Sequence, residues 1–270
     1  MTPIRLLAMD LDDTLLHSDL SISLRTRNVL RKAQTQGIIV ALASSRDPVF
    51  LDKFSVLLGL SKWPGYVIAN NGTLVQESMT GTIIFEAKIP IETALMIFDI
   101  ADAEGFTVQI YDDDIMYVSH KDKFTDINQK TSGIRHVVVE NFRSMTAAGC
   151  HKMLIPGKPE KVASLARILD SYADRVTIQA LKPHQLEVLP LGVDKGSALA
   201  KVAERCSISR EEVLAIGDSM NDESMLRWAG CSVAMKNADS KLKEIAVFVT
   251  DKSNDEDGVA EVIERYILHE

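Results

Sequence analysis

Near its start the chain reads IRLLAMDLDDTLL (residues 4–16), a short apolar run that ends in two acidic residues one position apart, Asp10 and Asp12. The run predicts a buried strand, because it is too short for most helices. Carboxylates at the edge of a core repel each other, and a divalent cation relieves that repulsion. Two carboxylates with different partners also suit different roles, one as a nucleophile and one as an acid or base. An acidic turn explains a single Asp-x-Asp pair equally well, so the rest of the chain must decide.

Four further apolar runs also end in small or polar residues. They cover residues 38–43, 66–69, 213–216 and 231–235, and they are followed by Ser44-Ser45-Arg46, Asn70-Asn71-Gly72, Gly217-Asp218-Ser219 and Lys236-Asn237. Helical segments lie between several of these runs, and two of the helices have predicted N-caps at Ser23 and Asp47. Buried strands that alternate with helices predict an α/β fold with a doubly wound, Rossmann-like parallel sheet. Such sheets bind ligands at the carboxyl ends of their strands, so we expect the polar residues to gather at one edge.

The middle of the chain has a different pattern. A predicted helix at residues 91–104 is followed by short strand-like runs at 106–111, 115–118, 151–155, 176–180 and 185–189, with one more helix at 159–172. We therefore predict an inserted α+β domain at residues 86–190, within a core formed by residues 1–85 and 191–270.

Composition limits the partners of the protein. The 270 residues include 30 Lys and Arg against 38 Asp and Glu, so the formal charge is −8, which argues against nonspecific nucleic-acid binding. The apolar runs are far shorter than the roughly 20 residues of a membrane span, and no secretory signal is visible. The three cysteines form no Cys-x-x-Cys pair, which fits a reduced setting. We expect a cytoplasmic enzyme without nucleic-acid or membrane partners, as a monomer or small homo-oligomer.

The candidate chemistry lies at the ends of the predicted strands. Asp10, Asp12 and Asp218 can form an oxygen-rich site suited to Mg²⁺, and hard oxygen ligands without clustered His or Cys disfavour zinc. Ser44 offers a hydroxyl at the end of another strand. Lys195 stands at a predicted helix start, where a cation gains nothing from the helix dipole, so we expect an anion nearby. Acids, Mg²⁺, a hydroxyl and a lysine at one edge indicate a phosphoryl-transfer site.

In order and spacing, residues 10–14, Ser44, Lys195 and residues 217–222 resemble the four motifs of the haloacid dehalogenase superfamily. Further segments resemble its Cof-type subfamily of sugar and metabolite phosphatases, namely residues 71–72, 186–188, 192–196, 234–238 and 254–259. The resemblance implies that Asp10 is the nucleophile and forms an aspartyl-phosphate, with Asp12 as the acid and base. It also implies that Mg²⁺ is held by Asp10, the backbone carbonyl of Asp12, and Asp218.

Other roles follow from the same resemblance. Ser44 and Lys195 are expected to hold the phosphoryl oxygens with help from Asn221, while Asp222 supports the ligands of the metal. The inserted domain is similar to a large α/β cap that closes over the substrate and excludes water. Ser44-Ser45 stands where many relatives have Thr-Gly; the hydroxyl is kept, but Ser45 lacks the backbone freedom of glycine.

Some alternatives stay open at this point. Arg46 either contacts phosphate or forms a salt bridge beneath its loop, and Glu187 either faces the substrate or pairs with a nearby cation. The sequence favours a Mg²⁺-dependent hydrolase acting on a small phosphorylated metabolite, a soluble phosphomonoester. A phosphomutase would share the nucleophile and the metal. A phospho-accepting signalling domain is disfavoured, because such domains are about half this length and lack the acid two residues after the acceptor.

Overall fold

The chain forms two compact units in the computed structural model, which describes residues 2–112, 115–132, 134–146 and 149–270. The core unit comprises residues 1–86 and 194–270, and the inserted unit comprises residues 87–193. None of the helices within the described ranges has the length and apolar character needed to cross a bilayer.

The core unit is built on an eight-stranded sheet with the order β14-β13-β12-β1-β2-β3-β4-β5. Its strands are β1 (Leu6–Asp10), β2 (Ile39–Ala43), β3 (Gly65–Ala69), β4 (Leu74–Glu77), β5 (Ile83–Glu86), β12 (Val213–Gly217), β13 (Cys231–Ala234) and β14 (Phe248–Val249). The strands from β14 to β3 are parallel, which confirms the predicted doubly wound sheet. At the other edge β4 and β5 run antiparallel, a hairpin that the sequence pattern did not reveal.

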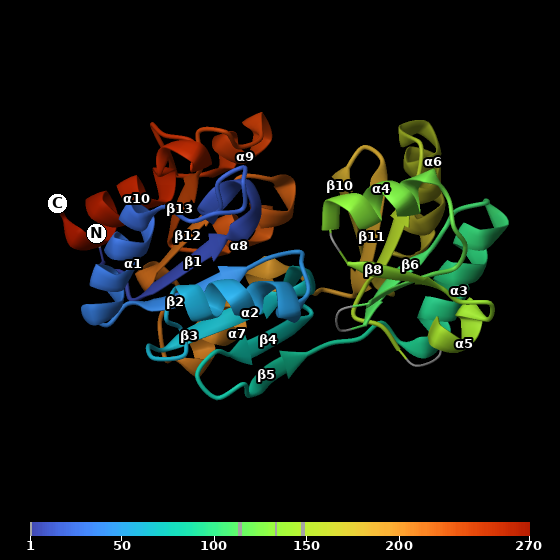
Figure 1. Ribbon diagram of the computed structural model, residues 1–270, viewed down its shortest axis with the longest axis horizontal. Helices are drawn as coiled ribbons and strands as arrows, with labels where there is room; N and C mark the ends of the chain where they lie inside the picture. Colours follow the sequence, from blue (N-terminus) through green and yellow to red (C-terminus); the bar gives the residue numbers. More distant parts are fainter. Residues whose placement is uncertain (1, 113–114, 133, 147–148) are drawn as a thin grey trace. The chain divides into compact units, whose positions relative to one another are not determined.

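Helices cover both faces of this sheet (Figure 1). They are α1 (Leu24–Thr35), α2 (Pro48–Leu57), α7 (Lys195–Arg205), α8 (Glu223–Trp228), α9 (Ser240–Ile245) and α10 (Gly258–Ile263). The predicted caps are present, since the side chains of Ser23 and Asp47 accept hydrogen bonds from the backbone of Thr26 and Phe50. All five residues of β1 and of β12 are buried. The carboxyl ends of these two central strands therefore meet at one edge, with Asp10 and Gly217 as their last residues.

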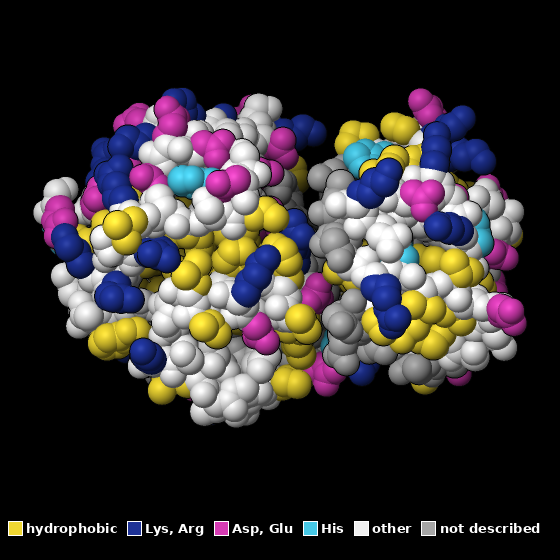
Figure 2. All heavy atoms as spheres, viewed as in Figure 1, with side chains coloured by type: hydrophobic (Ala, Val, Ile, Leu, Met, Phe, Trp, Pro, Cys, Tyr) yellow, Lys and Arg dark blue, Asp and Glu magenta, His cyan; other side chains and the backbone are white. Residues whose placement is uncertain are grey.

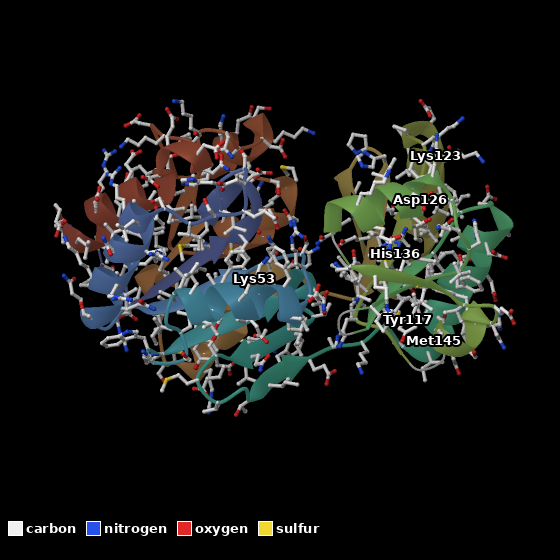
Figure 3. All side chains as sticks on the ribbon, viewed as in Figure 1. Lys53, Tyr117, Lys123, Asp126, His136 and Met145 are labelled. Atoms are coloured by element: carbon white, nitrogen blue, oxygen red, sulfur yellow. The ribbon has the colours of Figure 1, made fainter. Side chains whose placement is uncertain are left out.

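The inserted unit contains a six-stranded sheet with the order β10-β11-β9-β6-β7-β8. Its strands are β6 (Gln109–Asp112), β7 (Ile115–Val118), β8 (Arg135–Val138), β9 (Met153–Pro156), β10 (Val176–Lys182) and β11 (Gln185–Pro190), and its helices are α3 (Ile91–Ala103), α4 (Lys123–Ser132), α5 (Phe142–Thr146) and α6 (Pro159–Leu169). Helix α4 lies over one face of this sheet, where Asp126 on the helix is near His136 of β8 (Figure 3). The side chain of Asn128 on the same helix donates a hydrogen bond to Gln109 of β6.

Charges are mixed on the visible face of the protein. Figure 2 shows Lys and Arg side chains interspersed with Asp and Glu side chains, and no continuous basic stripe runs over the described residues in this view. The mixture of charges on this face agrees with the modest acidic net charge of the chain.

Candidate active site

A buried lysine joins two acids at the carboxyl edge of the core sheet. Lys195 is the first residue of α7, and its side chain is fully buried. Its Nζ lies 2.5 Å from Oδ1 of Asp10 and 2.6 Å from Oδ1 of Asp222. The capping side chain of Asp194 accepts a hydrogen bond from the backbone of Ser197, which fixes the start of the helix. The negative charge that we expected near Lys195 is therefore supplied by two carboxylates of the protein itself.

Asp218 and Asp222 complete a compact group of acids. Single carboxylate oxygens of Asp10, Asp218 and Asp222 all lie within 4.8 Å of one another, a spacing that could hold a metal ion. Asp218 accepts a hydrogen bond from the hydroxyl of Thr14 at 2.8 Å. The second oxygen of Asp222 accepts the backbone N–H groups of Asp218 and Ser219. Both carboxylate oxygens of Asp222 are thus engaged in hydrogen bonds. Asp10 is the last residue of β1, and Asp218 directly follows β12.

Asp10 and Asp222 are buried and Asp218 is half-buried, and the pKa values of Asp10 and Asp218 reflect this burial and the neighbouring charges. Burial raises the pKa of Asp10 well above its usual range, and Asp222 and Asp218 raise it further, while Lys195 opposes them. Burial and Asp222 also raise the pKa of Asp218 to about 7. Burial alone would lower the pKa of Lys195, but its attraction to Asp10 and Asp222 outweighs burial and raises it. A cation placed among these oxygens would therefore remove a large electrostatic cost.

Asp12 lies apart from this group because Arg46 binds its carboxylate. The guanidinium donates from Nε to Oδ2 at 2.9 Å and from Nη2 to Oδ1 at 2.7 Å. Arg46 also lies over the ring of Phe50, 4.0 Å from its centroid. The turn that carries Asp12 is strained, since Asp13 has a φ of 58°. The salt-bridge interpretation of Arg46 is thus observed, and contact with phosphate stays a prediction.

Ser44 follows the end of β2 and is fully buried. Its hydroxyl accepts the backbone N–H of Arg46 at 3.1 Å, and its own N–H donates to the carbonyl of Ile68 on β3. Ser45, the next residue, is half-buried. These bonds shape the loop after β2, where we predicted phosphoryl oxygens to bind.

A second strained turn, residues 70–72, packs against the site; the sequence indicated that Asn71 shapes a loop, but the contact of this turn with α7 was not predicted. Asn70 and Asn71 have φ values of 49° and 55°, and Gly72 has a φ of 101°. A Cβ atom on Gly72 would lie 2.3 Å from the carbonyl oxygen of Asp194, so this turn packs directly against the start of α7. Asn71 also accepts a hydrogen bond from the side chain of Asn221 at 3.2 Å. The Asn-Asn-Gly sequence, which tolerates positive φ, was the available signal.

Glu187 belongs to the inserted unit, on β11. Its side chain is buried and lies 3.4 Å from Nζ of Lys152, which is also buried. The ammonium group of Lys152 lies 4.5 Å from the ring centroid of Tyr111. Pairing with a nearby cation is therefore observed for Glu187, while its contact with substrate stays a prediction. Lys152 lies in the strand-like run 151–155, but it was missed because lysine is rarely buried unless it is paired.

Comparisons with known proteins identify the family of this chain. A family model described as haloacid dehalogenase-like hydrolase matches residues 7–263. The chain is 28% identical to the phosphatase YwpJ of Bacillus subtilis, covering 97% of this chain and all of that protein. It is 29% identical to the 5-amino-6-(5-phospho-D-ribitylamino)uracil phosphatase YcsE of the same organism, covering 98% and 96% of the two chains. A haloacid dehalogenase-like hydrolase from Bacteroides thetaiotaomicron has a similar structure, with a TM-score of 0.87, 30% identity, and 97% and 99% coverage.

Proposed function

Because this chain belongs to the haloacid dehalogenase-like hydrolases and is a phosphatase, we propose that it hydrolyses a small phosphorylated metabolite through an aspartyl-phosphate on Asp10, with Mg²⁺ as cofactor. The observation that carries this proposal is the group formed by Asp10, Lys195, Asp218 and Asp222 at the ends of β1, β12 and the start of α7. A nucleophilic carboxylate, a buried cation and a further acid pair within a few ångströms suit phosphoryl transfer.

The residues present fit Mg²⁺. The group offers only carboxylate oxygens, which are hard ligands that this ion prefers. A bound cation would also relieve the repulsion among these acids, which adds to burial in raising the pKa values of Asp10 and Asp218. We assign direct binding to Asp10 and Asp218 and to the backbone carbonyl of Asp12. Asp222 has both oxygens engaged by Lys195 and by backbone N–H groups, so its role is support. When bound, the ion neutralises charge on the phosphoryl oxygens and on the nucleophile.

The protein residues would act in two steps. In the first, a carboxylate oxygen of Asp10 forms a bond to phosphorus while the bond from phosphorus to the leaving oxygen breaks, and Asp12 donates a proton to that oxygen. In the second, the oxygen of a water molecule forms a bond to the phosphorus of the aspartyl-phosphate while the bond from phosphorus to Asp10 breaks. The water gives a proton to Asp12, phosphate is released, and the carboxylate of Asp10 is restored. Lys195, the hydroxyl of Ser44 and the loop at Ser45 would hold the phosphoryl oxygens, with Asn221 assisting. Arg46 binds both carboxylate oxygens of Asp12 and would orient that carboxyl group for the leaving oxygen.

The substrate is proposed to be a small phosphomonoester, in keeping with the substrate named for the relative YcsE. We propose that the inserted unit acts as a cap that selects the leaving group, with Glu187 among its contacts. The same proposal places the enzyme in the cytoplasm, where its cysteines, all three of them free thiols, would stay reduced.

Phosphate release across a panel of phosphorylated metabolites tests the proposal. Wild-type protein should release phosphate with Mg²⁺ and stop in EDTA, and Asp10→Asn should be inactive because an amide is not a nucleophile. Asp13→Asn is the matched control, since it makes the same acid-to-amide change in the same turn at an exposed residue. Beryllium fluoride should label Asp10 in the wild type and in Asp13→Asn, and it should not label Asp10→Asn. Full activity of Asp10→Asn would overturn the mechanism, and an isomerised product without free phosphate would indicate a phosphomutase.

A further inference from the structure

Two asparagines from the last quarter of the chain hold the turn that carries Asp12. Asn237 donates a hydrogen bond from Nδ2 to the backbone carbonyl of Asp13 at 2.7 Å. Asn254 donates from Nδ2 to the carbonyl of Leu16 at 3.0 Å, three residues further along the same turn. The backbone N–H of Asn254 donates to Oδ1 of Asn237 at 3.0 Å, which fixes the orientation of that amide. One connected set of bonds therefore spans the segment directly after Asp12.

This turn needs external support. Asp13 has a φ of 58°, a conformation that residues other than glycine rarely adopt unless their surroundings impose it. The carbonyl that Asn237 binds belongs to this strained residue, next to Asp12. Asn237 thus holds the peptide between Asp13 and Thr14, which begins one residue after Asp12 and sets where the strained turn lies.

The loop that carries Asn237 is itself fixed to the acid group. The backbone N–H of Met235 donates to the carbonyl of Gly217 at 3.0 Å, and that of Asp239 donates to the carbonyl of Asp218 at 2.8 Å. The loop therefore lies between the end of β12 and the turn after β1, and it fixes the Asp12 turn relative to Asp218. The segment around Asn254, which the proposed chemistry leaves without a role, braces this loop.

We propose that Asn237 and Asn254 are positioning residues that aim the carboxyl group of Asp12 at the leaving oxygen. This inference rests on the proposed role of Asp12 as the acid. Loss of either side-chain donation should let the strained turn relax and displace that carboxyl group, while Asp10, Lys195 and Asp218 keep their contacts. A misplacement of about 1 Å typically costs up to roughly 100-fold in rate.

The dependence of kcat/KM on the leaving group distinguishes a positioning role from a merely structural one, because a structural defect would lower kcat/KM equally for both substrates. A p-nitrophenolate departs without help from an acid, whereas the alkoxide of a sugar or polyol phosphate needs a proton as it departs. The experiment compares kcat/KM for an alkyl phosphate with kcat/KM for p-nitrophenyl phosphate in Asn237→Ala, Asn237→Asp and Asn254→Ala. We expect the ratio of the two values to fall about 10- to 100-fold, in the same direction as in Asp12→Asn. Asn237 is exposed, so its variants should fold and decide the outcome even if the buried Asn254 does not tolerate change.

Arg25→Ala is the matched control. Arg25 of α1 joins Glu264 near the end of the chain through hydrogen bonds of 3.3 and 2.6 Å, so it links the same two stretches of sequence without touching the turn. The ratio of kcat/KM values for the two substrates in Arg25→Ala should equal that of the wild type.

An unchanged ratio in the Asn237 variants, together with a lowered ratio in Asp12→Asn, would overturn the inference and leave the proposed function intact. An unchanged ratio in Asp12→Asn would instead remove the acid role of Asp12, and with it the premise. Wild-type behaviour of Asn237→Asp, which keeps the acceptor for Asn254 but cannot donate to Asp13, would also overturn the inference.

Discussion

Arg46 holds Asp12 by both carboxylate oxygens, although the two residues lie 34 positions apart in the sequence. The pair is bidentate and partly exposed, and the planar guanidinium sets the plane of the carboxylate as well as its position. The residue proposed to move protons is therefore oriented by a neighbour before any substrate arrives.

A double-mutant cycle should show that Arg46 acts through Asp12. We expect Arg46→Ala to lower kcat/KM for an alkyl phosphate about tenfold, because a carboxyl group without its orienting partner is positioned poorly. In an Asp12→Asn background the same change should have little further effect. Lys53→Ala is the control, since the ammonium group of Lys53 on α2 (Figure 3) also lies 4.0 Å from the ring centroid of Phe50. Additive losses would mean that Arg46 acts on the phosphoryl group independently.

The acids Asp10 and Asp218 should make the metal-free protein less stable as the pH rises. The pKa of Asp218 is raised from 3.8 to about 7 and that of Asp10 is also raised, both chiefly by burial. A group with a raised pKa in the folded state stabilises the fold below its unfolded pKa, and this contribution is lost as pH rises through the folded value. The free energy of unfolding in EDTA should therefore decline between about pH 4 and pH 7.

Mg²⁺ should reverse that decline, because it binds the ionised acids. We expect excess Mg²⁺ to raise Tm more at pH 8 than at pH 5.5, as measured by thermal unfolding. Asp218→Asn should flatten the pH dependence in EDTA and weaken the effect of Mg²⁺. Equal shifts at both pH values would contradict a metal site at these acids.

Replacing Lys195 should damage both stability and catalysis. Lys195→Met removes the cation that contacts both Asp10 and Asp222, and breaking a buried pair typically costs about 3–5 kcal/mol. Urea unfolding at pH 8 and phosphate release measure the two effects. Lys201→Met on the exposed side of the same helix should change the free energy of unfolding by no more than about 0.5 kcal/mol. A fully stable and active Lys195→Met variant would refute this assignment.

Replacing Gly72 tests the contact between the turn at residues 70–72 and the start of α7. Gly72→Ala imposes a positive φ on alanine, which costs about 1–2 kcal/mol, and also forces its Cβ against the carbonyl oxygen of Asp194. Gly37→Ala shares the first cost but not the second, because Gly37 has a φ of 91° and no atom within 4 Å of the added Cβ. We expect Gly72→Ala to be the more destabilising of the two and to lower kcat, since it displaces the helix that begins with Lys195. Equal losses in Tm and unchanged kcat would show that the contact is unimportant.

The buried pair in the inserted unit separates selectivity from stability. Glu187→Ala should weaken kcat/KM for a hydroxyl-rich phosphate more than for p-nitrophenyl phosphate, because an unpaired hydroxyl typically costs about 1–3 kcal/mol. It should also destabilise the protein, since Lys152 stays buried without this carboxylate. A double change, Lys152→Met with Glu187→Leu, should recover stability but not selectivity. Equal losses on both substrates would withdraw Glu187 from substrate selection.

The sequence predicted those features that depend on local pattern. The apolar run before Asp10, the caps at Ser23 and Asp47, and the α/β class can all be read from short segments. The hairpin of β4 and β5 was missed, because its residues are half polar and partly exposed. The partners of Asp12 could not be predicted, since they depend on side-chain orientation across the folded core. For the same reason the bonds from Asn237 to Asp13 and from Asn254 to Leu16 became visible only in three dimensions.

The discontinuous core unit has a consequence for how the protein is made. β1 lies between β2, which follows it closely, and β12, which begins only at residue 213. The inserted unit is one continuous stretch, residues 87–193, so the ribosome completes it before α7 and β12 are translated. Domains fold as units during synthesis, and the inserted unit can therefore fold while Asp10 still lacks Lys195, Asp218 and Asp222. Asp10 is thus synthesised 185 residues before Lys195, and Asp222 follows another 27 residues later, so the proposed site can assemble only late in translation.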